Sequence, residues 1–420
     1  MRNGFGVAGI AALALACSAF GFASPAMAQT MVYQIDAPAR APAAEAPAAE
    51  APAAEATEIP ADLNILFWTQ DQRDYAFRRM EELAPARVVA HGDHVLTLGQ
   101  GGPLDVSVEV EGESWDVDAY MADQRAASLI VVQNGEVRLE RYALGADADT
   151  RWTSFSVAKS LTSTLVGAAI EDGYIDSLNA PVTQYIPELA GSGYDGVTIA
   201  QLLTMTSGVR WNEDYTDPNS DVALFNNVTP EPGIDPIVTY MRTLESEAEP
   251  GTRWQYNTGE TNLIGVLVAN ATGRTLSEYL SEKIWRPFGM EHDAVWMLNA
   301  GGREIGGCCI SATARDYARF GMFVLTGGNG VVPDGWFGLA GSRQADIGAP
   351  GRGYGYQWWT FDDGSFAAQG IFGQGIFIDH SRGLVIASNG DWTTATSQAM
   401  GARRIAFYRA VQATIDAEAE

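Results

Sequence analysis

Strand-like segments near both ends of the chain, with helical segments between them, constrain its fold most strongly. Residues 129–132 and 137–142 flank Asn134-Gly135, which is the strongest short-range signal for a tight hairpin turn. The late strand-like segments are 354–361, 374–379 and 384–388. Strands from both ends can pair in one sheet. The sequence therefore predicts an α+β fold with one antiparallel sheet flanked by helices, and a mainly helical second lobe.

The first 61 residues differ in composition from the rest of the chain. A basic start, an apolar stretch over Val7 to Phe22 and the small-x-small triplet Ala26-Met27-Ala28 predict a signal peptide over residues 1–28. Residues 29–61 are rich in Ala, Pro and Glu, which predicts a disordered linker. We therefore expect a folded domain over 62–420 that is periplasmic or secreted, without stable membrane insertion once the signal is removed. Lipid attachment through Cys17 is a less favoured alternative.

Charge and motifs exclude several classes of function. The formal net charge of −26 would repel phosphate, which argues against a nucleic-acid partner. The sequence has no Gly-x-Ser-x-Gly elbow and no Gly-x-x-x-x-Gly-Lys-Ser/Thr phosphate loop. His91 and His94 lack a third ligand at suitable spacing, so they predict a turn rather than a metal site. We expect no metal and no cofactor, and the oligomeric state stays open.

Ser156 and Lys159 are the strongest candidates for chemistry. They lie three residues apart at the predicted start of a helix, so they share one helical face. A serine hydroxyl is a weak nucleophile until a base takes its proton, and a lysine held neutral beside it can do so. The helix start also favours a developing oxyanion. The alternative is a helix cap and a surface lysine.

Two further stretches could complete a site. Tyr256 lies in a loop that leads into a predicted helix, where its phenol could point into a cleft or simply pack as an aromatic. Gly373 and Gly375 lie on a late strand and would let a substrate approach its edge, or they could be plain hairpin glycines. Five residues in loops near the cleft are candidates for substrate contact: Trp211, Tyr215, Asp217, Asn227 and Asn257. The alternative is that they are ordinary solvated loop residues.

In this order and at these spacings, the chain resembles the serine β-lactamase and penicillin-binding-protein superfamily. Within it, the chain is similar to class C β-lactamase-related hydrolases of the 6-aminohexanoate-dimer hydrolase and carboxylesterase group. The resemblance covers roughly residues 62–420. The phrases that carry it are Leu202 to Gly208 followed by Trp211, Tyr256 to Asn262, and Ala312 to Gly321.

The resemblance implies a β-lactamase/transpeptidase-like fold and a role for each candidate. Ser156 would form an acyl-enzyme, and Lys159 would take its proton, which requires a pKa below the usual value of about 10.4 through burial and nearby positive charge. Tyr256 would protonate the leaving group and then help to activate water. Gly373, Gln374, Gly375 and Ile376 would form the substrate strand. The N–H groups of Ser156 and Ile376 would form the oxyanion hole.

Two departures from the family pattern bear on the substrate. Gly373-Gln374-Gly375 stands where enzymes that act on β-lactams usually have Lys-Thr-Gly, and Thr258 stands where Tyr-x-Asn has its Asn. Both departures favour a small ester or amide of the 6-aminohexanoate-oligomer or carboxylester kind. A β-lactamase or D-Ala-D-Ala peptidase, and a non-catalytic binding or sensor module on the same fold, remain alternatives.

Cys308 and Cys309 are adjacent in the sequence. Neighbouring alpha carbons are closer than disulfide geometry usually allows. The sequence therefore predicts two small buried residues and no disulfide.

Overall fold

The structure, a computed structural model, describes residues 59–60, 65–225 and 228–420. The predicted signal peptide, nearly all of the predicted linker and Asn227 lie outside these residues. Within the described part of the chain, no helix is long and apolar enough to cross a membrane.

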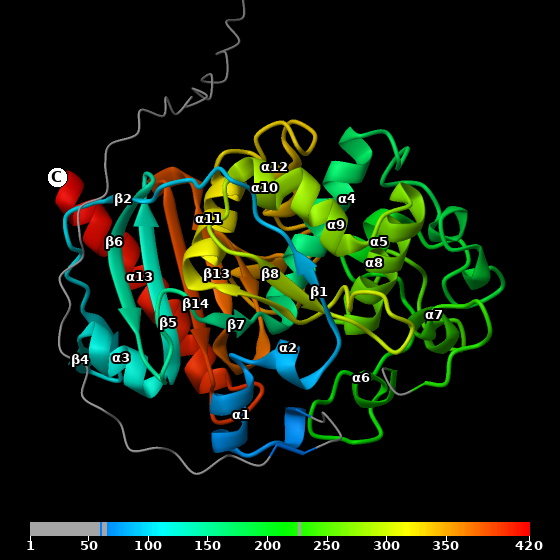
Figure 1. The fold of residues 1–420 in the computed structure, drawn as a ribbon, viewed down its shortest axis with the longest axis horizontal. Coiled ribbons are helices and arrows are strands. Elements are labelled where there is room, and N and C mark those ends of the chain that lie inside the picture. Colours follow the sequence, from blue (N-terminus) through cyan, green and yellow to red (C-terminus); the bar gives the residue numbers. More distant parts are fainter. Residues whose placement is uncertain (1–58, 61–64, 226–227) are drawn as a thin grey trace, which may run out of the picture. The chain divides into compact units, whose positions relative to one another are not determined.

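An eight-stranded sheet formed from both ends of the chain is the centre of the fold (Figure 1). In spatial order its strands are β10 (Arg352–Tyr354), β11 (Trp359–Phe361), β12 (Phe366–Gln369), β13 (Gly375–Asp379), β14 (Leu384–Gly390), β5 (Ala126–Gln133), β6 (Glu136–Tyr142) and β2 (Gly99–Gln100). The late strand β14 pairs with the early strand β5, and every neighbouring pair is antiparallel except β2 with β6. The predicted antiparallel sheet from both chain ends is confirmed.

Turn residues explain one correct prediction and one error in this sheet. Asn134 and Gly135 have φ of 50° and 85°, the left-handed values that a two-residue hairpin between β5 and β6 needs. The segment 354–361, predicted as one strand, is instead the hairpin of β10 and β11, in which Tyr354 pairs with Trp359. Gln357 has φ of 65° in that turn. Alternation of side chains continues on both sides of the turn, so it does not reveal the reversal.

The remaining strands form two smaller sheets. One has the order β1 (Ala86–Val89), β8 (Ala294–Met297), β9 (Ile310–Thr313) and β7 (Arg151–Thr153), and the other is the hairpin of β3 (Val108–Val110) and β4 (Glu113–Trp115). β7 leads directly into the turn that carries Ser156, and β9 follows directly on Cys308 and Cys309. The four-stranded sheet therefore brings the nucleophile turn next to the two cysteines, because β7 and β9 are paired.

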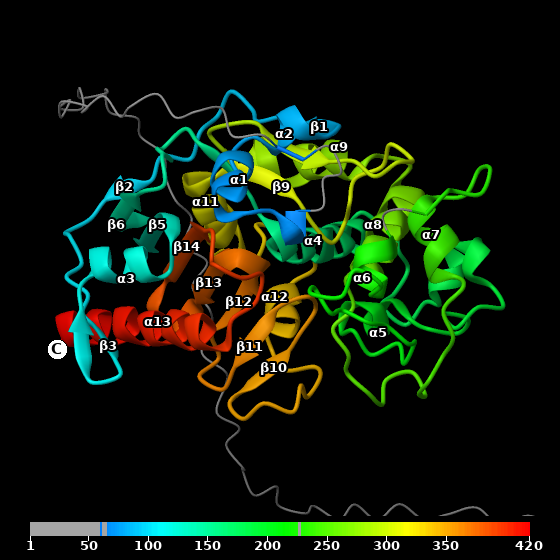
Figure 2. The same cartoon turned by 90° about the horizontal axis from the view of Figure 1, so that it is seen from below.

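Helices cover both faces of the main sheet and also form the lobe beside it. The α-helices of the described residues are α1 (Gln70–Ala76), α2 (Met80–Leu83), α3 (Val117–Asp123), α4 (Ala158–Glu171), α5 (Ile199–Leu203), α6 (Asp221–Leu224), α7 (Pro236–Met241), α8 (Thr258–Thr272), α9 (Leu276–Leu280), α10 (Arg286–Phe288), α11 (Ala314–Leu325), α12 (Trp336–Ala340) and α13 (Gln398–Ala419). The views in Figures 1 and 2 show α13 along one face of the sheet, and α4 to α8 gathered in a helical lobe beside it.

The core follows the period-two pattern of the strands. On β13, Ile376 and Ile378 belong to the large apolar cluster shared with α4, α8 and α11, whereas Phe377 belongs to the cluster that α13 covers. Phe377 stacks on Tyr408 of α13 with ring centroids 4.3 Å apart. The strand is therefore buried on both faces, and its backbone is paired on both sides.

Candidate active site

Ser156 lies in a short 3-10 turn (Phe155–Val157) between β7 and α4. From residue 152 to residue 169 it is the one residue whose side chain is not buried. Phe155, directly before it, has φ of 43°, which side chains with a Cβ rarely adopt. The Phe155 ring is held against Phe77 and Phe372, with centroids 4.9 Å and 5.3 Å apart. Packing therefore maintains a strained turn that leaves the Ser156 hydroxyl accessible.

Lys159 follows one helical turn later and is 1% exposed. Its Nζ donates a hydrogen bond to the carbonyl oxygen of Gly307 at 2.7 Å, and it lies 5.5 Å from the centre of the Tyr256 ring. Burial lowers the pKa of the Lys159 amine to about 8, while the negative charge of Glu213 acts in the opposite direction. The expected contribution of nearby positive charge is therefore wrong, and burial is the cause.

Tyr256 is brought to the same place by the loop before α8. The loop is tied down where Gln255 N donates to Met205 O at 3.0 Å, and the Tyr256 ring stacks on Trp359 with centroids 5.6 Å apart. Burial and the charge of Glu213 raise the pKa of the Tyr256 phenol, and a hydrogen bond with the Ser156 hydroxyl opposes this rise. The phenol therefore stays protonated at neutral pH.

These three side chains bring a hydroxyl, an amine and a phenol together in one site. At neutral pH a fraction of the Lys159 amine is uncharged, because its pKa is about 8. An uncharged amine can accept the Ser156 proton, and a protonated phenol can donate one to a leaving group. Such a set can carry out acyl transfer through a covalent intermediate.

The substrate strand predicted at Gly373, Gln374, Gly375 and Ile376 needs correction. Ile376 lies on β13, where it pairs with Ala368 of β12 on one side and Ala387 of β14 on the other. An N–H group inside a sheet faces a neighbouring strand, so Ile376 cannot offer it to an oxyanion. A Cβ on Gly373 would meet the Trp392 ring, and one on Gly375 would lie 2.9 Å from the Tyr408 hydroxyl, so neither glycine faces Ser156.

The residues that face Ser156 lie five positions earlier, where β12 ends. A Cβ on Gly370 would lie 2.6 Å from Ser154 O and 3.1 Å from Ser156 N, so only glycine permits this approach. The N–H of Ile371, the next residue, replaces that of Ile376 as the candidate oxyanion donor. Gln-Gly-Ile-Phe occurs twice, at 369–372 and 374–377, which explains why sequence reasoning chose the wrong copy.

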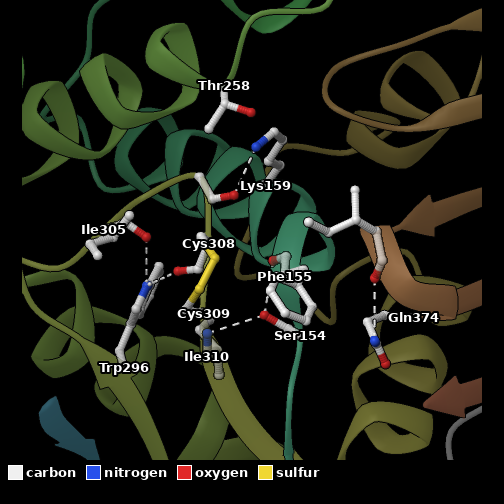
Figure 3. The surroundings of a disulfide bond; sticks show 12 residues. Ser154, Phe155, Lys159, Thr258, Trp296, Ile305, Cys308, Cys309, Ile310 and Gln374 are labelled. Carbon is white, nitrogen blue, oxygen red and sulfur yellow. Dashed lines mark hydrogen bonds between the residues drawn. A yellow bond between two sulfur atoms is a disulfide. The ribbon is translucent and has the colours of Figure 1, made fainter. Parts of the chain in front are cut away.

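Gln374 supports this turn from behind and does not line the site. It is 1% exposed, and its side-chain amide donates to Gly390 O at 2.8 Å and to Ile371 O at 3.3 Å. Its backbone carbonyl accepts from Gly370 N at 2.9 Å. Figure 3 shows Gln374 on the far side of the turn from Lys159.

The predicted loop contacts divide into structural residues and one residue near the site. Trp211 is 4% exposed and packs edge-on against Phe225, with centroids 5.6 Å apart. Asn257 is 1% exposed and caps α8, because its Oδ1 accepts from Glu260 N at 3.1 Å. Asp217 accepts from Asn219 N at 2.8 Å within its own turn. We therefore remove Trp211, Asn257 and Asp217 from the candidate substrate contacts.

Tyr215 stays near the site because it is partly exposed and belongs, together with the buried Trp211, to a hydrogen-bonded cluster centred on Glu213, a residue that sequence reasoning missed. The Glu213 carboxylate accepts from the Tyr215 hydroxyl at 2.6 Å, from Thr258 N at 3.0 Å, and also from Thr258 Oγ1 and Trp211 Nε1. This cluster fastens the loop to the first turn of α8, next to Tyr256. Acidic residues are common in polar loops, so only the fold distinguishes Glu213 from its neighbours.

Cys308 and Cys309 form a disulfide between adjacent residues, contrary to the prediction that they stay unpaired. Their alpha carbons are 3.7 Å apart, and Cys309 adopts φ of 72°, which turns the backbone so that the two side chains meet. Figure 3 shows the disulfide between Lys159 and Ser154, with hydrogen bonds from Trp296 to the carbonyls of Ile305 and Cys308. The pairing rule failed because it considers only the distance between alpha carbons, whereas the left-handed φ of Cys309 brings the two side chains together at that short distance.

Metal ligands are not gathered anywhere in the described ranges. No group of three or more His, Cys, Asp and Glu side chains there is arranged to hold a metal ion.

Comparison with known proteins identifies the family. The family model described as Beta-lactamase matches residues 116–407. A 6-aminohexanoate-dimer hydrolase of Paenarthrobacter ureafaciens is 33% identical over 342 residues, which cover 76% of this chain and 85% of that protein.

Solved structures share the fold at lower sequence identity. A candidate 6-aminohexanoate-dimer hydrolase from Bacillus anthracis has a TM-score of 0.74 at 24% identity, covering 86% of this chain and 99% of its own. A family VIII carboxylesterase has a TM-score of 0.52 at 20% identity, covering 70% of this chain and 96% of its own. The extent of the family match and the identity to the Paenarthrobacter protein together show that this chain belongs to the Beta-lactamase family of serine hydrolases.

Proposed function

We propose that this chain is an exported serine hydrolase that cleaves a small ester or amide through an acyl-enzyme on Ser156. The observation that carries the proposal is Lys159, which is 1% exposed, has a pKa lowered to about 8, and lies one helical turn from the accessible Ser156. A buried lysine without an acidic partner is costly for the fold, and such costs are concentrated at functional sites. The other lysine of the chain, Lys283, pairs with Asp172 at 2.6 Å.

In the proposed reaction, the neutral Lys159 amine takes the Ser156 proton as Oγ attacks the substrate carbonyl. The N–H groups of Ser156 and Ile371 hold the oxyanion of the tetrahedral intermediate. Tyr256 donates its proton to the departing alcohol or amine, which leaves an acyl group on Ser156. The same network then activates a water molecule that attacks the acyl group and releases the acid.

The corrected third stretch supports an ester or short amide rather than a β-lactam. Once Ile371 replaces Ile376, the residues that stand at the position of Lys-Thr-Gly are Ala368, Gln369 and Gly370 at the end of β12. None of them has the positive charge that Lys-Thr-Gly would supply to a substrate carboxylate. Gln369 instead accepts a hydrogen bond from Arg404 Nη2 at 2.9 Å. The name of the Paenarthrobacter relative also supports amide cleavage of a 6-aminohexanoate dimer.

Export is proposed from residues 1–28 alone, whose basic start, apolar stretch and Ala-x-Ala site are typical of a signal peptide. The mature protein would then act in the periplasm or outside the cell on a small-molecule substrate. N-terminal sequencing of the exported protein would test this; a terminus at Gln29 is expected, and an intact Met1 on the exported protein would contradict it.

A fluorophosphonate probe tests the nucleophile directly. Intact mass should show one adduct on the wild type, none on Ser156→Ala, and one on Ser342→Ala, which removes an exposed serine as a matched control. An equal adduct on Ser156→Ala, or none on the wild type, would contradict the proposal and favour a non-catalytic binding module. A panel of p-nitrophenyl esters, 6-aminohexanoate dimer and nitrocefin then tests the substrate class. Turnover of nitrocefin well above that of the esters would favour the β-lactamase alternative.

A further inference from the structure

The Cys308–Cys309 disulfide lies between the two parts of the site that hold the base and the nucleophile. On one flank, the carbonyl of Gly307 accepts from Lys159 Nζ at 2.7 Å. On the other flank, Ile310 O accepts from Ser154 N at 2.7 Å, and Ile310 N donates to Ser154 Oγ at 3.1 Å. Figure 3 shows the yellow disulfide between these two sets of hydrogen bonds. A single short segment therefore contacts both Lys159 and the turn that carries Ser156.

The disulfide also holds that segment in an unusual backbone conformation. Cys309 has φ of 72°, a left-handed value that residues with a Cβ avoid when nothing imposes it. The side facing β8 is anchored, because Cys309 O accepts from Met297 N and Cys308 O accepts from Trp296 Nε1, both at 3.1 Å. If the ring opens, Cys309 can return toward negative φ, and the displacement passes toward Gly307, whose own N–H donates a longer bond of 3.3 Å to Asn262 Oδ1.

The Gly307 carbonyl has a specific effect on the amine that it binds. A neutral lysine amine has two N–H bonds and one lone pair, so donation of one N–H to Gly307 leaves only two directions in which the lone pair can point. A Cβ on Gly307 would lie 3.1 Å from Lys159 Nζ and 3.1 Å from Thr258 Cγ2, so the backbone is packed closely around the amine. A shift of Gly307 would both turn the lone pair and open the packing around Nζ.

We propose that the Cys308–Cys309 disulfide is a positioning element for Lys159, which aligns the amine with Ser156 while the ring is closed and lowers turnover when the ring is reduced. The inference rests on the role of Lys159 proposed above. Cys308 and Cys309 touch no reacting atom in this account; they act through the Gly307 carbonyl and the Ile310–Ser154 hydrogen bonds.

Reduction needs a dithiol as the electron donor. Cys308 is partly exposed and Cys309 is 5% exposed, so the thiolate of the dithiol attacks Cys308 Sγ. The Cys308–Cys309 bond breaks, Cys309 leaves as a thiolate and takes a proton, and the second thiol of the donor releases Cys308. Two electrons and two protons pass to the protein, and the donor becomes a disulfide. A disulfide oxidant reverses the step.

The test compares the full chain before and after treatment with dithiothreitol, with the redox state verified by alkylation and intact mass. We expect kcat on a p-nitrophenyl ester to fall about tenfold on reduction, since displacement of a catalytic group by a fraction of an ångström has effects of this size or larger. KM should change less than about twofold, because no substrate contact is lost. The pH midpoint of kcat should move upward, because water reaches Nζ and weakens the desolvation that lowers its pKa.

Two variants separate positioning from a purely structural role. Cys308→Ser/Cys309→Ser should behave like the reduced wild type with and without dithiothreitol. Cys308→Ala/Cys309→Gly should recover most of the lost kcat and ignore the reductant, since glycine adopts positive φ without a ring. Thermal melts at each step establish that every sample is folded.

Each remaining outcome overturns the inference. Cysteines that alkylate without reductant would mean that the ring is not formed. If kcat is unchanged after verified reduction, the disulfide is only a structural link. The same holds if kcat falls but the pH midpoint of kcat stays the same or moves lower. The proposed function is judged separately by fluorophosphonate labelling of Ser156 in the oxidised protein. Labelling there that is insensitive to reduction rejects this inference alone, whereas no labelling there rejects the proposed function.

Discussion

Helix α4 and the turn between β12 and β13 both contribute to the candidate site, and they are built in different ways. At the start of α4 the important groups are two side chains three residues apart, Ser156 in the turn before the helix and Lys159 in its first turn, and the helix that follows is buried. In the turn the important groups are backbone atoms of Gly370 and Ile371, and their position depends on strand register. The comparison shows that the nucleophile and base are local in sequence, whereas the oxyanion geometry is assembled from distant segments.

The largest effect on kcat is expected on the α4 side, when Lys159 is replaced by a side chain that cannot lose its proton. Lys159→Arg keeps the positive charge, but guanidinium stays protonated in proteins. We expect kcat to fall about 1,000-fold, within the range typical of a lost general base. Lys283→Arg is the matched control, because Lys283 pairs with Asp172 away from the site, and its steady-state kinetics should stay within about twofold of the wild type. Similar rates for both variants would refute a role for the Lys159 amine.

The next effect distinguishes the two copies of Gln-Gly-Ile-Phe. Gly370→Ala should lower kcat about 100-fold, because the new Cβ would push the Ile371 N–H and the Ser156 turn apart. Gly375→Ala should leave kcat within about twofold and lower Tm by a few degrees, because its Cβ would press on the Tyr408 hydroxyl in the core. The reverse pattern in kinetics and melting would restore the rejected assignment at Ile376.

A smaller effect is expected in the pH dependence. Lys159 must be neutral to act, so kcat should rise with pH and reach half its maximum near the lowered pKa of about 8. Glu213 raises that pKa, and therefore Glu213→Gln should move the midpoint to lower pH. Glu231→Gln is the control, because Glu231 pairs with Arg242 at 3.5 Å on the surface of the same region. Measured pH–rate profiles in which Glu213→Gln shifts upward would contradict the electrostatic account.

The smallest effect on chemistry is expected from Glu260, which lies on α8 behind the Tyr256 loop and is 1% exposed. Burial raises its pKa to about 8, against a hydrogen bond from Ser207. In the unfolded chain Glu260 loses its proton near pH 4.5, so the protonated folded form loses stability as pH rises from about 4.5 to about 8.

Glu260→Gln, which imitates the neutral acid, removes this loss. The difference in Tm between the variant and the wild type should therefore become more favourable to the variant from pH 5 to pH 8, while kcat stays within about threefold. A constant difference in Tm across this range would show that Glu260 is already charged in the folded protein.

The same contrast between local and distant contacts explains how much the sequence could predict. Asn134-Gly135 predicts its hairpin, because the whole signal lies in two neighbouring residues. Ser156 and Lys159 are related by one helical turn. The Cys308–Cys309 ring, the contact of Gly307 with Lys159 and the choice of Gly370 over Gly375 depend on register and on a left-handed residue. Strand register and a left-handed backbone conformation cannot be predicted from residue type alone. Gly370 and Gly375, for example, stand in the same tetrapeptide.

Residues that sequence reasoning assigned to the substrate show the same limit. Trp211 and Asn257 have the residue types of a binding loop, and both are used for packing or capping. Glu213 has no distinguishing sequence signal, but four hydrogen-bond donors converge on its carboxylate. The function of a polar loop residue therefore depends on the partners that the fold brings to it.

The most direct test of the central claim is a rapid-mixing measurement with a p-nitrophenyl ester, followed by acid quench and peptide mass analysis. The account predicts a burst of nitrophenol close to one equivalent per site, with the acyl group on the peptide that contains Ser156. Tyr256→Phe should form the same acylated peptide, because p-nitrophenolate leaves without a proton from Tyr256, and should retain the acyl group longer, because the phenol no longer helps to activate the water. An acyl group on another residue would contradict the acyl-enzyme mechanism. Linear release of nitrophenol with no acylated Ser156 at any time after mixing would contradict it as well.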